Sequence, residues 1–510
     1  MPLSPPPFLR RPAGRTLLLL ALAGSLGGCT LFTPAPDLEQ RRLQVSVPEQ
    51  WQGPAPARAE TTTEADEAAV LAQWWTRFND PLLDQLIAQG LSASPDLRSA
   101  QAKLRSARAS RDLAAADYYP GLSASTGATG SKASPAVSGG SSRRTTIYDA
   151  GFDASWEPDI FGVVRQDVSA ADADVAAQAA TLEYARVTLV GEVARNYVEL
   201  RTYQERLQIA RDNASSQADT LEITQWRQQA GLATELDVEQ ARTSLEQTRA
   251  TIPALVSNVA ASQNRLAVLL GQTPGSLQER LGSARPLPAA PREIAVGIPA
   301  DALRRRPDVR AAERTLAAET ARVHARVAER YPSFTLSGSF GWQALTSGAL
   351  GGSGTVARSL AGTLAATLFD GGRLKSRIAV QDAAQEQALI AYEQKILTAL
   401  EDTENALAAY AAGREQEATR RRAAEAARNA AQLARQMYQA GLTDFQKVLD
   451  TERTRLSAED SLATARLAVL SAVIQLYKAL GGGWSAPEAP ADAIAATAAT
   501  SLSTQEKTAP

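Results

Sequence analysis

The chain has 510 residues, a length that ordinarily corresponds to three or four domains. Its 53 Lys and Arg residues nearly balance 55 Asp and Glu residues, so the net charge of -2 provides no global field to attract nucleic acid. The composition includes one Cys, one His and two Met. This scarcity excludes zinc or copper sites built from Cys and His clusters, internal disulfides, and hydrolase triads, unless the lone His324 serves alone. Carboxylate chemistry and functions without chemistry remain open, and no cofactor is expected.

The N-terminus is predicted to be an export signal peptide covering 1–28. A basic stretch precedes a short apolar run at 16–26, which is too short to span a membrane stably. The run ends in Leu-Gly-Gly before Cys29, which is similar to the lipobox where bacterial lipoproteins are cleaved and acylated. Cys29 is therefore the predicted lipidation site, the alternative being a chance cysteine after an ordinary signal. Thr30 stands where inner-membrane lipoproteins carry Asp, which favours the outer membrane of a Gram-negative cell.

The rest of the chain is internally repeated. The hexapeptide that begins at Pro95 recurs, with conservative changes, from Pro307, and Tyr119-Pro recurs as Tyr331-Pro at the same offset. Both hexapeptides begin with a proline at the position where prolines open helices. The chain is therefore predicted to contain two similar halves, each about 210 residues long, in place of three or four domains.

Each half contains a very long helical segment and a shorter returning helix. We expect these at about 162–230 and 233–270 in the first half, and at about 372–440 and 443–480 in the second. The long helices would each extend roughly 100 Å, further than a soluble globular core requires. Glycines between the segments turn the chain back on itself. This favours a bundle or tube of helices over an extended coiled coil.

Upstream of each long helix the hydrophobic period changes from 3.6 to 2. Phe340 and Trp342 lie at even positions flanked by Ser, Gly and Gln residues, and Phe152 lies at an even position between Gly and Asp. Loops rich in Gly and Ser connect the alternating segments. The pattern predicts two β-hairpins, at about 119–158 and 331–369.

One face of these hairpins is apolar with aromatic residues, and the other carries small, polar or acidic residues. This alternation is typical of transmembrane β-barrels, the alternative being soluble hairpins packed on a helix. Four strands cannot close a barrel, and an open sheet edge in lipid leaves backbone groups unsatisfied. If the strands cross a membrane, several chains must combine them, and three chains would supply twelve.

In their order and spacing, several motifs resemble the TolC-like outer-membrane efflux factors, in the lipoprotein (NodT-type) branch that serves resistance-nodulation-division pumps. The resemblance covers Cys29 to Trp484. The motifs are the lipobox, Trp74-Trp75, Phe78-Asn79-Asp80-Pro81-Leu82, Trp156-Glu-Pro-Asp-Ile-Phe-Gly162, Leu303-Arg-Arg-Arg-Pro-Asp-Val-Arg310, Tyr331-Pro332, Phe369-Asp-Gly-Gly-Arg373 and Val448-Leu-Asp450. The resemblance implies a mixed, mainly α fold: a homotrimer with a 12-stranded barrel in the outer membrane, four strands per chain, and a helical tunnel across the periplasm.

The resemblance also implies a passive duct that is not an enzyme and binds no cofactor, metal or nucleic acid. Its implied partners are two other copies of the chain, outer-membrane lipid, a periplasmic adaptor (membrane fusion) protein, and an inner-membrane pump of the resistance-nodulation-division type. In the family the tunnel closes at its periplasmic tip, where the helix pairs turn. The corresponding turns here are Gly231-Leu232 and Gly441-Leu442, which the resemblance implies as the adaptor-docking tips.

Three residues match the family's gate. Asp450 matches an aspartate that lines the constriction, and Asp237 and Tyr438 match an aspartate and its tyrosine partner in the closed state. A ring of three Asp450 carboxylates would favour cations. Thr443 replaces an arginine, and Lys447 an acid, of one well-known member, which implies a differently built closed state.

The predicted organisation follows from these features. It comprises a signal peptide (1–28), an N-terminal lipid-anchored segment and girdle (29–94), a first repeat (95–302) ending in a linker (271–302), a second repeat (303–484), and a disordered tail (485–510).

Two other functions remain open. A type I protein secretion conduit would share the architecture, although the lipobox argues against it. A lipid-anchored periplasmic glycan hydrolase would use paired carboxylates and predicts a soluble monomer once Cys29 is replaced. The exported substrate is not predicted.

Overall fold

The computed structural model describes residues 44–53, 70–132, 134, 136, 144–291, 294 and 298–484. The chain divides into two compact units, Met1–Gln44 and Val45–Pro510, and all the described helices and strands belong to the second. The predicted signal peptide, Cys29 and the predicted disordered tail lie outside the described residues.

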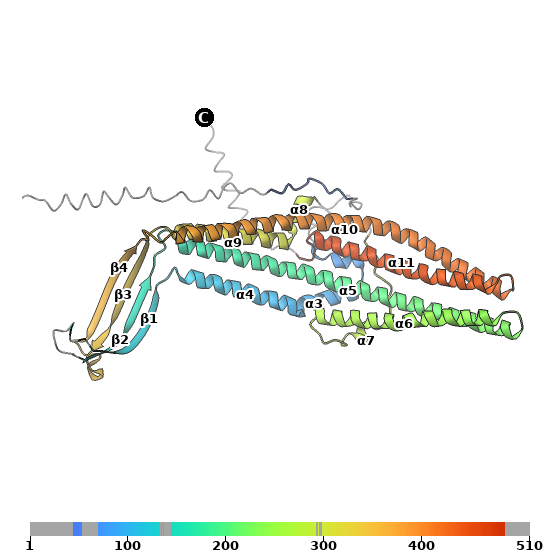
Figure 1. Ribbon diagram of the computed structural model, residues 1–510, viewed down its shortest axis with the longest axis horizontal. Coiled ribbons are helices and arrows are strands. Elements are labelled where there is room, and N and C mark those ends of the chain that lie inside the picture. The colour runs from blue at the N-terminus through green and yellow to red at the C-terminus, as the bar shows by residue number, and fades with distance from the viewer. Residues whose placement is uncertain are drawn as a thin grey trace, which may run out of the picture. The chain divides into compact units, whose positions relative to one another are not determined.

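Two pairs of antiparallel helices dominate the fold (Figure 1). Helices α5 (Val163–Gln229) and α10 (Arg373–Gln439) have 67 residues each, and helices α6 (Glu235–Leu269) and α11 (Phe445–Ala479) return along them with 35 residues each. At 1.5 Å per residue the long helices extend about 100 Å. Their bounds differ by a few residues at most from the expected ranges.

The two turns between these helices have the same construction. Gly231 and Gly441 adopt φ angles of 76° and 75°, in the left-handed region that favours glycine. After each glycine, the amide of Leu232 or Leu442 donates a hydrogen bond back into the last turn of the long helix, to Arg227 O (2.7 Å) and Met437 O (2.8 Å) respectively. This Schellman arrangement satisfies the carbonyls at the helix end and fixes the direction in which the chain returns.

Shorter helices complete each repeat. Helix α4 (Pro95–Ala116) packs on α5, and α9 (Pro307–Ala328) packs on both α5 and α10; both have 22 residues and a proline in the first turn. The sequence prediction did not identify several other elements: η3 (Trp74–Phe78), α3 (Pro81–Ala93), α7 (Gln278–Leu281), α8 (Pro299–Arg305) and η4 (Ser347–Ala349).

The four expected strands form one antiparallel sheet in the order β1-β2-β3-β4. Their bounds are β1 Gly121–Lys132, β2 Arg144–Trp156, β3 Ser333–Ala344 and β4 Val356–Ala365. The sheet lies at one end of the helices, and the two helix turns lie at the other (Figure 1). Strands β1 and β4 are unpaired edges among the described residues. A mainly α fold with four strands per chain is confirmed.

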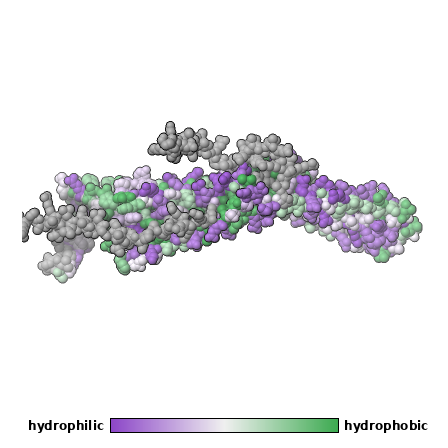
Figure 2. Space-filling view, turned by 90° about the horizontal axis from the view of Figure 1, so that it is seen from above, coloured by the Kyte–Doolittle hydropathy of each residue, from purple (hydrophilic) through white to green (hydrophobic). Residues whose placement is uncertain are grey.

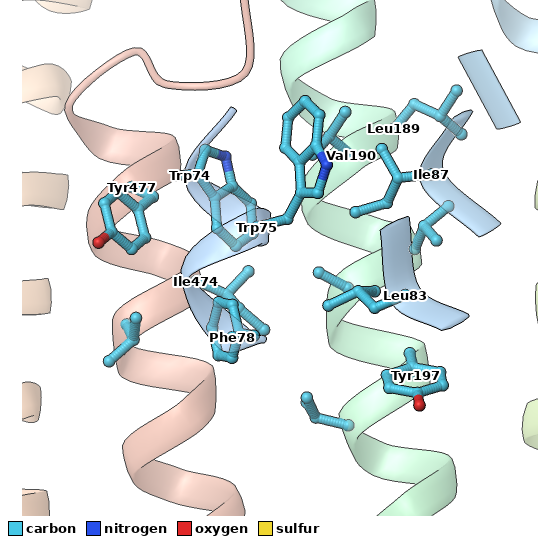
Figure 3. Packing of buried hydrophobic residues seen from close by; sticks show 14 of the residues in the cluster. Trp74, Trp75, Phe78, Leu83, Ile87, Leu189, Val190, Tyr197, Ile474 and Tyr477 are labelled. Carbon is cyan, nitrogen blue, oxygen red and sulfur yellow. The ribbon is translucent and has the colours of Figure 1, made fainter. Parts of the chain in front are cut away.

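The main hydrophobic core lies where an N-terminal segment inserts between α5 and α11. Trp74, Phe78 and Leu83 enter from η3 and α3 and are almost fully buried (Figure 3). The indole of Trp74 stacks on Tyr477 of α11, with ring centroids 5.1 Å apart and planes inclined by 13°. The core thereby joins the first repeat, the second repeat and the N-terminal segment.

Helix α11 is the one described helix long and apolar enough to cross a membrane by length and composition. In its apolar window, 61% is buried inside the bundle, and Val473, Ile474 and Tyr477 belong to the main core. Its apolar character is therefore explained by packing.

Candidate functional site

The sheet presents a large apolar face that the single chain does not cover. Residues directly opposite each other in a sheet share a face. The register pairs Leu122 with Ala154, Phe152 with Phe340, and Gly338 with Leu360, so all even-numbered positions share one face. The large apolar residues exposed on this face are Leu122, Phe152, Phe340, Val356, Leu360 and Leu364. An uncovered apolar face of this kind indicates contact with lipid or another protein.

The charged exceptions on this face lie near the strand ends that meet the loops. They are Lys132, Arg144 and Arg358. Long basic side chains at such positions can extend their charges towards an aqueous boundary while their stems remain in an apolar layer.

Apart from Ile147, the opposite, odd-numbered face is small, polar and acidic. Asp149 and Asp153 lie on it beside Ser residues, and Ser125 donates a hydrogen bond to Asp153 (3.2 Å). Gly151 and Gly341 face each other across β2 and β3 so closely that a Cβ on Gly341 would lie 2.6 Å from Ala150 O. The sheet therefore requires the absence of a side chain at this crossing point.

The second exposed apolar surface lies at the helix turns. Leu232 and Leu442, at the predicted docking tips, are 67% and 73% exposed, and Leu236 and Trp226 beside them are also exposed. Figure 2 shows hydrophobic residues gathered at this end of the helices. We call Trp226, Leu232, Leu236 and Leu442 the tip patch.

The predicted gate residues lie near these turns without contacting one another in the chain. Asp237 accepts hydrogen bonds from the backbone N and the Oγ1 of Thr234, both at 2.8 Å, and closes a capping box at the start of α6. Asp450 is exposed and accepts a hydrogen bond from Gln446 (3.1 Å). Tyr438 is buried and bonds across to Thr224 of α5 at 3.4 Å.

Arg227, which the sequence prediction missed, binds Tyr438 twice. Its guanidinium lies 4.6 Å from the centre of the tyrosine ring and donates a hydrogen bond to the Tyr438 carbonyl (2.8 Å). Arg227 thus links the end of α5 to the end of α10. A basic residue in the last turn of a helix was the available signal, but such residues commonly interact with their own helix end.

Thr443 and Lys447, the departures from the family pattern, lie at the second turn. Thr443 is half-buried, and the backbone N of Lys447 donates to the carboxylate of Asp444, which caps α11 (3.0 Å). The Lys447 side chain is exposed.

The Phe78-to-Leu82 motif has a structural explanation. Asp80 caps α3 by accepting from the backbone of Leu82 (3.0 Å), and its other oxygen accepts a hydrogen bond from the Tyr197 hydroxyl of α5. Burial and the hydrogen bond to Asp80 raise the pKa of Tyr197 to about 12. The motif thereby fixes the N-terminal segment to the first long helix.

The Arg-Arg-Arg-Pro-Asp motif places a charged cluster where α8 ends and α9 begins. Arg306 is buried and pairs with Asp308 (2.8 Å) and Asp402 (3.0 Å). Burial opposes ionisation of Asp308, but the hydrogen bonds and charge of Arg306 outweigh it and lower the pKa of Asp308. The described residues contain no group of three or more His, Cys, Asp and Glu side chains arranged to hold a metal ion.

Known proteins match the chain over most of its length. The sequence profile of the outer membrane efflux protein family matches residues 86–272 and 298–482, one range in each repeat. The pyoverdine export outer membrane protein OpmQ of Pseudomonas putida is 34% identical over 478 residues, covering 92% of this chain and 98% of the relative. Nodulation protein T of Rhizobium leguminosarum bv. trifolii is 32% identical over 448 residues, covering 85% and 92%.

Solved structures share the fold. The outer-membrane channel OprN superposes with a TM-score of 0.81 at 36% identity, covering 89% of this chain and all of that chain. The outer membrane protein VceC of Vibrio cholerae gives a TM-score of 0.74 at 27% identity, covering 81% and 99%. The chain therefore belongs to the outer membrane efflux protein family and is the outer-membrane component of an efflux system.

Proposed function

We propose that three copies of this chain form one passive channel through the outer membrane and periplasm. The observation that carries the proposal is the sheet, which combines an exposed apolar face with two unpaired edges, β1 and β4. Unpaired edges in lipid would leave backbone groups without hydrogen bonds, so closure is required. Three copies joined β4 to β1 give twelve strands, with Asp149 and Asp153 facing the lumen.

We propose that the tip patch receives a periplasmic adaptor, which couples the channel to an inner-membrane pump of the resistance-nodulation-division type. Leu232 and Leu442 support this role because each projects from a rigid Schellman turn and remains exposed. Apolar residues presented at helix ends fit the apolar face of another helical hairpin.

The gate remains our proposal for Asp237, Tyr438 and Asp450. The exposed carboxylate of Asp450 is available to line a constriction in a trimer. Tyr438 joins the two helix pairs through Arg227 and Thr224, so its contacts favour a closed arrangement. Opening would then be a two-state movement of helix pairs, biased by the adaptor.

We also propose that Cys29 is acylated and anchors the mature chain in the outer membrane. The sequence before it supports this step, and several acyl chains would make the attachment stable. The channel performs no catalysis in this scheme.

The pump, rather than the channel, is proposed to select the exported substrate. Similar relatives are named for different cargoes: pyoverdine export for OpmQ, and toluene efflux for TtgC of Pseudomonas putida at 32% identity. A channel that conducts many different substrates needs few specific contacts with any one of them. The chain's own cargo is therefore expected to follow its pump.

A deletion strain tests this function. Loss of the chain should increase susceptibility to drugs, aromatic solvents or metals, and plasmid-borne wild-type chain should restore resistance. Asp237→Ala combined with Asp450→Ala should raise the conductance of purified trimers in planar bilayers. Unchanged susceptibility with loss of a secreted protein would instead support the type I secretion conduit. A soluble Cys29→Ser monomer that cleaves glycans would support the hydrolase.

A further inference from the structure

The contact between α5 and α11 changes character along its length. Near the N-terminal segment it is apolar, with Val193 and Tyr197 of α5 in the same buried cluster as Val473 of α11. Towards the helix turns, polar and charged side chains replace these residues. On α5 the polar positions Arg206, Asn213 and Thr220 recur every seven residues, and on α11 Glu452, Glu459 and Arg466 do the same, which keeps each set on one stripe of its helix.

Four direct contacts join α5 to α11 at these positions or at the residues next to them. In order towards the turns, Glu205 accepts from Arg466 (2.7 Å), Asp460 from Arg206 (2.6 Å), Glu459 from Asn213 (3.1 Å) and Glu452 from Thr220 (2.8 Å). We call the eight residues of these contacts the polar seam. It joins the first repeat to the second over the half of the interface nearest the tip.

Helix α10 adds charge to the seam from the other side. Arg428 pairs with Glu459 (3.0 Å), and Arg435 pairs with Glu452 (3.3 Å). Arg455, on α11 itself, also reaches Glu459 (3.4 Å). Glu452 and Glu459 are 3% and 6% exposed, so these carboxylates are buried where three helices meet.

Buried ion pairs and apolar contacts respond differently when an interface separates. Exposing apolar surface to water costs free energy in proportion to its area. Buried charges recover their hydration on separation, so replacing a buried ion pair by apolar residues is often neutral or stabilising. Burial raises the pKa of Glu452 even though Thr220, Arg435 and Arg455 favour its ionised form. The seam is therefore the half of the interface that separates at the lower cost.

Water has access to both flanks of the seam. A groove of about 620 Å³ between α5, α6 and α11 is lined by Arg206 and Asp460 among other residues. A second groove of about 750 Å³ is lined by Glu205 and Arg466. Solvent can therefore replace the contacts of these pairs as the helices part.

We propose that the polar seam is the latch of the closed state, by which we mean the part of the interface whose contacts break when the tip opens. In this movement α10 and α11 stay joined to α5 at the apolar core and separate from it along the seam. This inference rests on the proposed channel function. It adds the four contacts of the polar seam to the gate residues as contacts that must break when the helices move apart. The apolar core acts as the pivot. The Tyr438 and Arg227 contacts at the tip are the last of the series.

Two variants of the seam should change the population of the open state in opposite directions. Arg435→Ala leaves Glu452 buried without its ion-pair partner, which should favour the open state by roughly tenfold or more. Replacing the same layer with apolar residues (Thr220→Val, Glu452→Leu and Arg435→Leu together) should make the seam dry and reduce opening by a similar factor. Glu246→Gln is the matched control because it removes an exposed pair with Arg249 on α6, outside the seam.

The readouts are single-channel conductance and the spin-label distance between α5 and α10. In a Cys29→Ser background, cysteines at the exposed positions Glu222 and Asn429 carry the labels. We expect longer distances and more open time for Arg435→Ala, shorter distances and less open time for the apolar triple variant, and no change for Glu246→Gln. If both variants match the control, the seam is not the latch. If neither the wild type nor Asp237→Ala/Asp450→Ala conducts, the proposed channel function is wrong. The spin-label distances between α5 and α10 are measured in detergent and do not depend on conductance, so they would still show whether the helices separate along the seam.

Discussion

The indole of Trp74 stacks on the ring of Tyr477, joining a segment near the start of the described chain to the end of its last helix. Trp74 is 1% exposed and also makes edge contacts with Trp75 and Phe78. Trp74→Ala should therefore lower the free energy of unfolding by about 4 kcal/mol through lost burial and a cavity. The melting temperature of the purified protein measures this effect. Trp226→Ala, which removes an exposed indole on α5, should leave it within a degree or two.

Asp308→Asn should destabilise the protein in a pH-dependent way. The substitution removes one partner of the buried Arg306, so we expect a loss of about 3 kcal/mol at pH 7. The pKa of Asp308 is lowered below 3.8 in the folded state, so its ionised form stabilises the fold above about pH 4. That contribution disappears as the pH falls through the lowered pKa. Melting curves of wild type and variant should therefore converge in acid; a constant difference would contradict the assignment. Asp301→Asn, in an exposed pair, should have little effect.

Gly341→Val should prevent barrel assembly. A Cβ at this position would lie 2.6 Å from the Ala150 carbonyl and 2.7 Å from the Cα of Gly151, which leaves no space for a side chain. We expect monomers or aggregates instead of trimers in sizing experiments on detergent-solubilised protein. Gly130→Val provides the control, because a Cβ there meets nothing within 4 Å. Normal trimers of Gly341→Val would show that β2 and β3 do not approach so closely.

Leu232→Asp combined with Leu442→Asp should weaken adaptor binding by at least about tenfold, since charges replace apolar contact residues. Surface plasmon resonance with a purified adaptor of the resistance-nodulation-division class measures the affinity. The trimer itself should be unaffected because both side chains are exposed. Leu345→Asp, an equally exposed position beyond β3, should bind like the wild type. Equal affinities for all three proteins would remove the tip patch as the docking site.

Much of the fold could be predicted from the sequence because its signals are local. A period of 2 identified all four strands, and the register places Phe152 and Phe340 on the shared face that the alternation predicts. Uninterrupted helical sequence and the glycines at 231 and 441 identified the long helices and their turns. Repetition predicted two halves, and the family profile matches two ranges, 86–272 and 298–482.

Features that depend on long-range contact were missed. Helix α3 is short, and Asp80 could not be recognised as its cap and as a partner of Tyr197 from sequence alone. The burial of Glu452 and Glu459 was also missed, because acidic residues on a helix normally indicate a solvated face. Their partners lie on two other helices, more than 200 residues away in the case of Thr220.

The gate was predicted from resemblance, and its residues stay a prediction. Within the chain, Asp237 is hydrogen-bonded to Thr234, and Tyr438 is hydrogen-bonded to Arg227 and Thr224. The family's pair of aspartate and tyrosine therefore does not form within one copy. Thr443, which replaces the family arginine, is consistent with a closed state held by other residues.

The mass of the Cys29→Ser protein, purified in detergent and measured by light scattering, tests most directly whether three copies build one channel. The exposed apolar face and the open edges β1 and β4 predict a particle with three times the chain mass that aggregates when detergent is removed. A soluble particle with the mass of one chain, stable without detergent, would contradict the account.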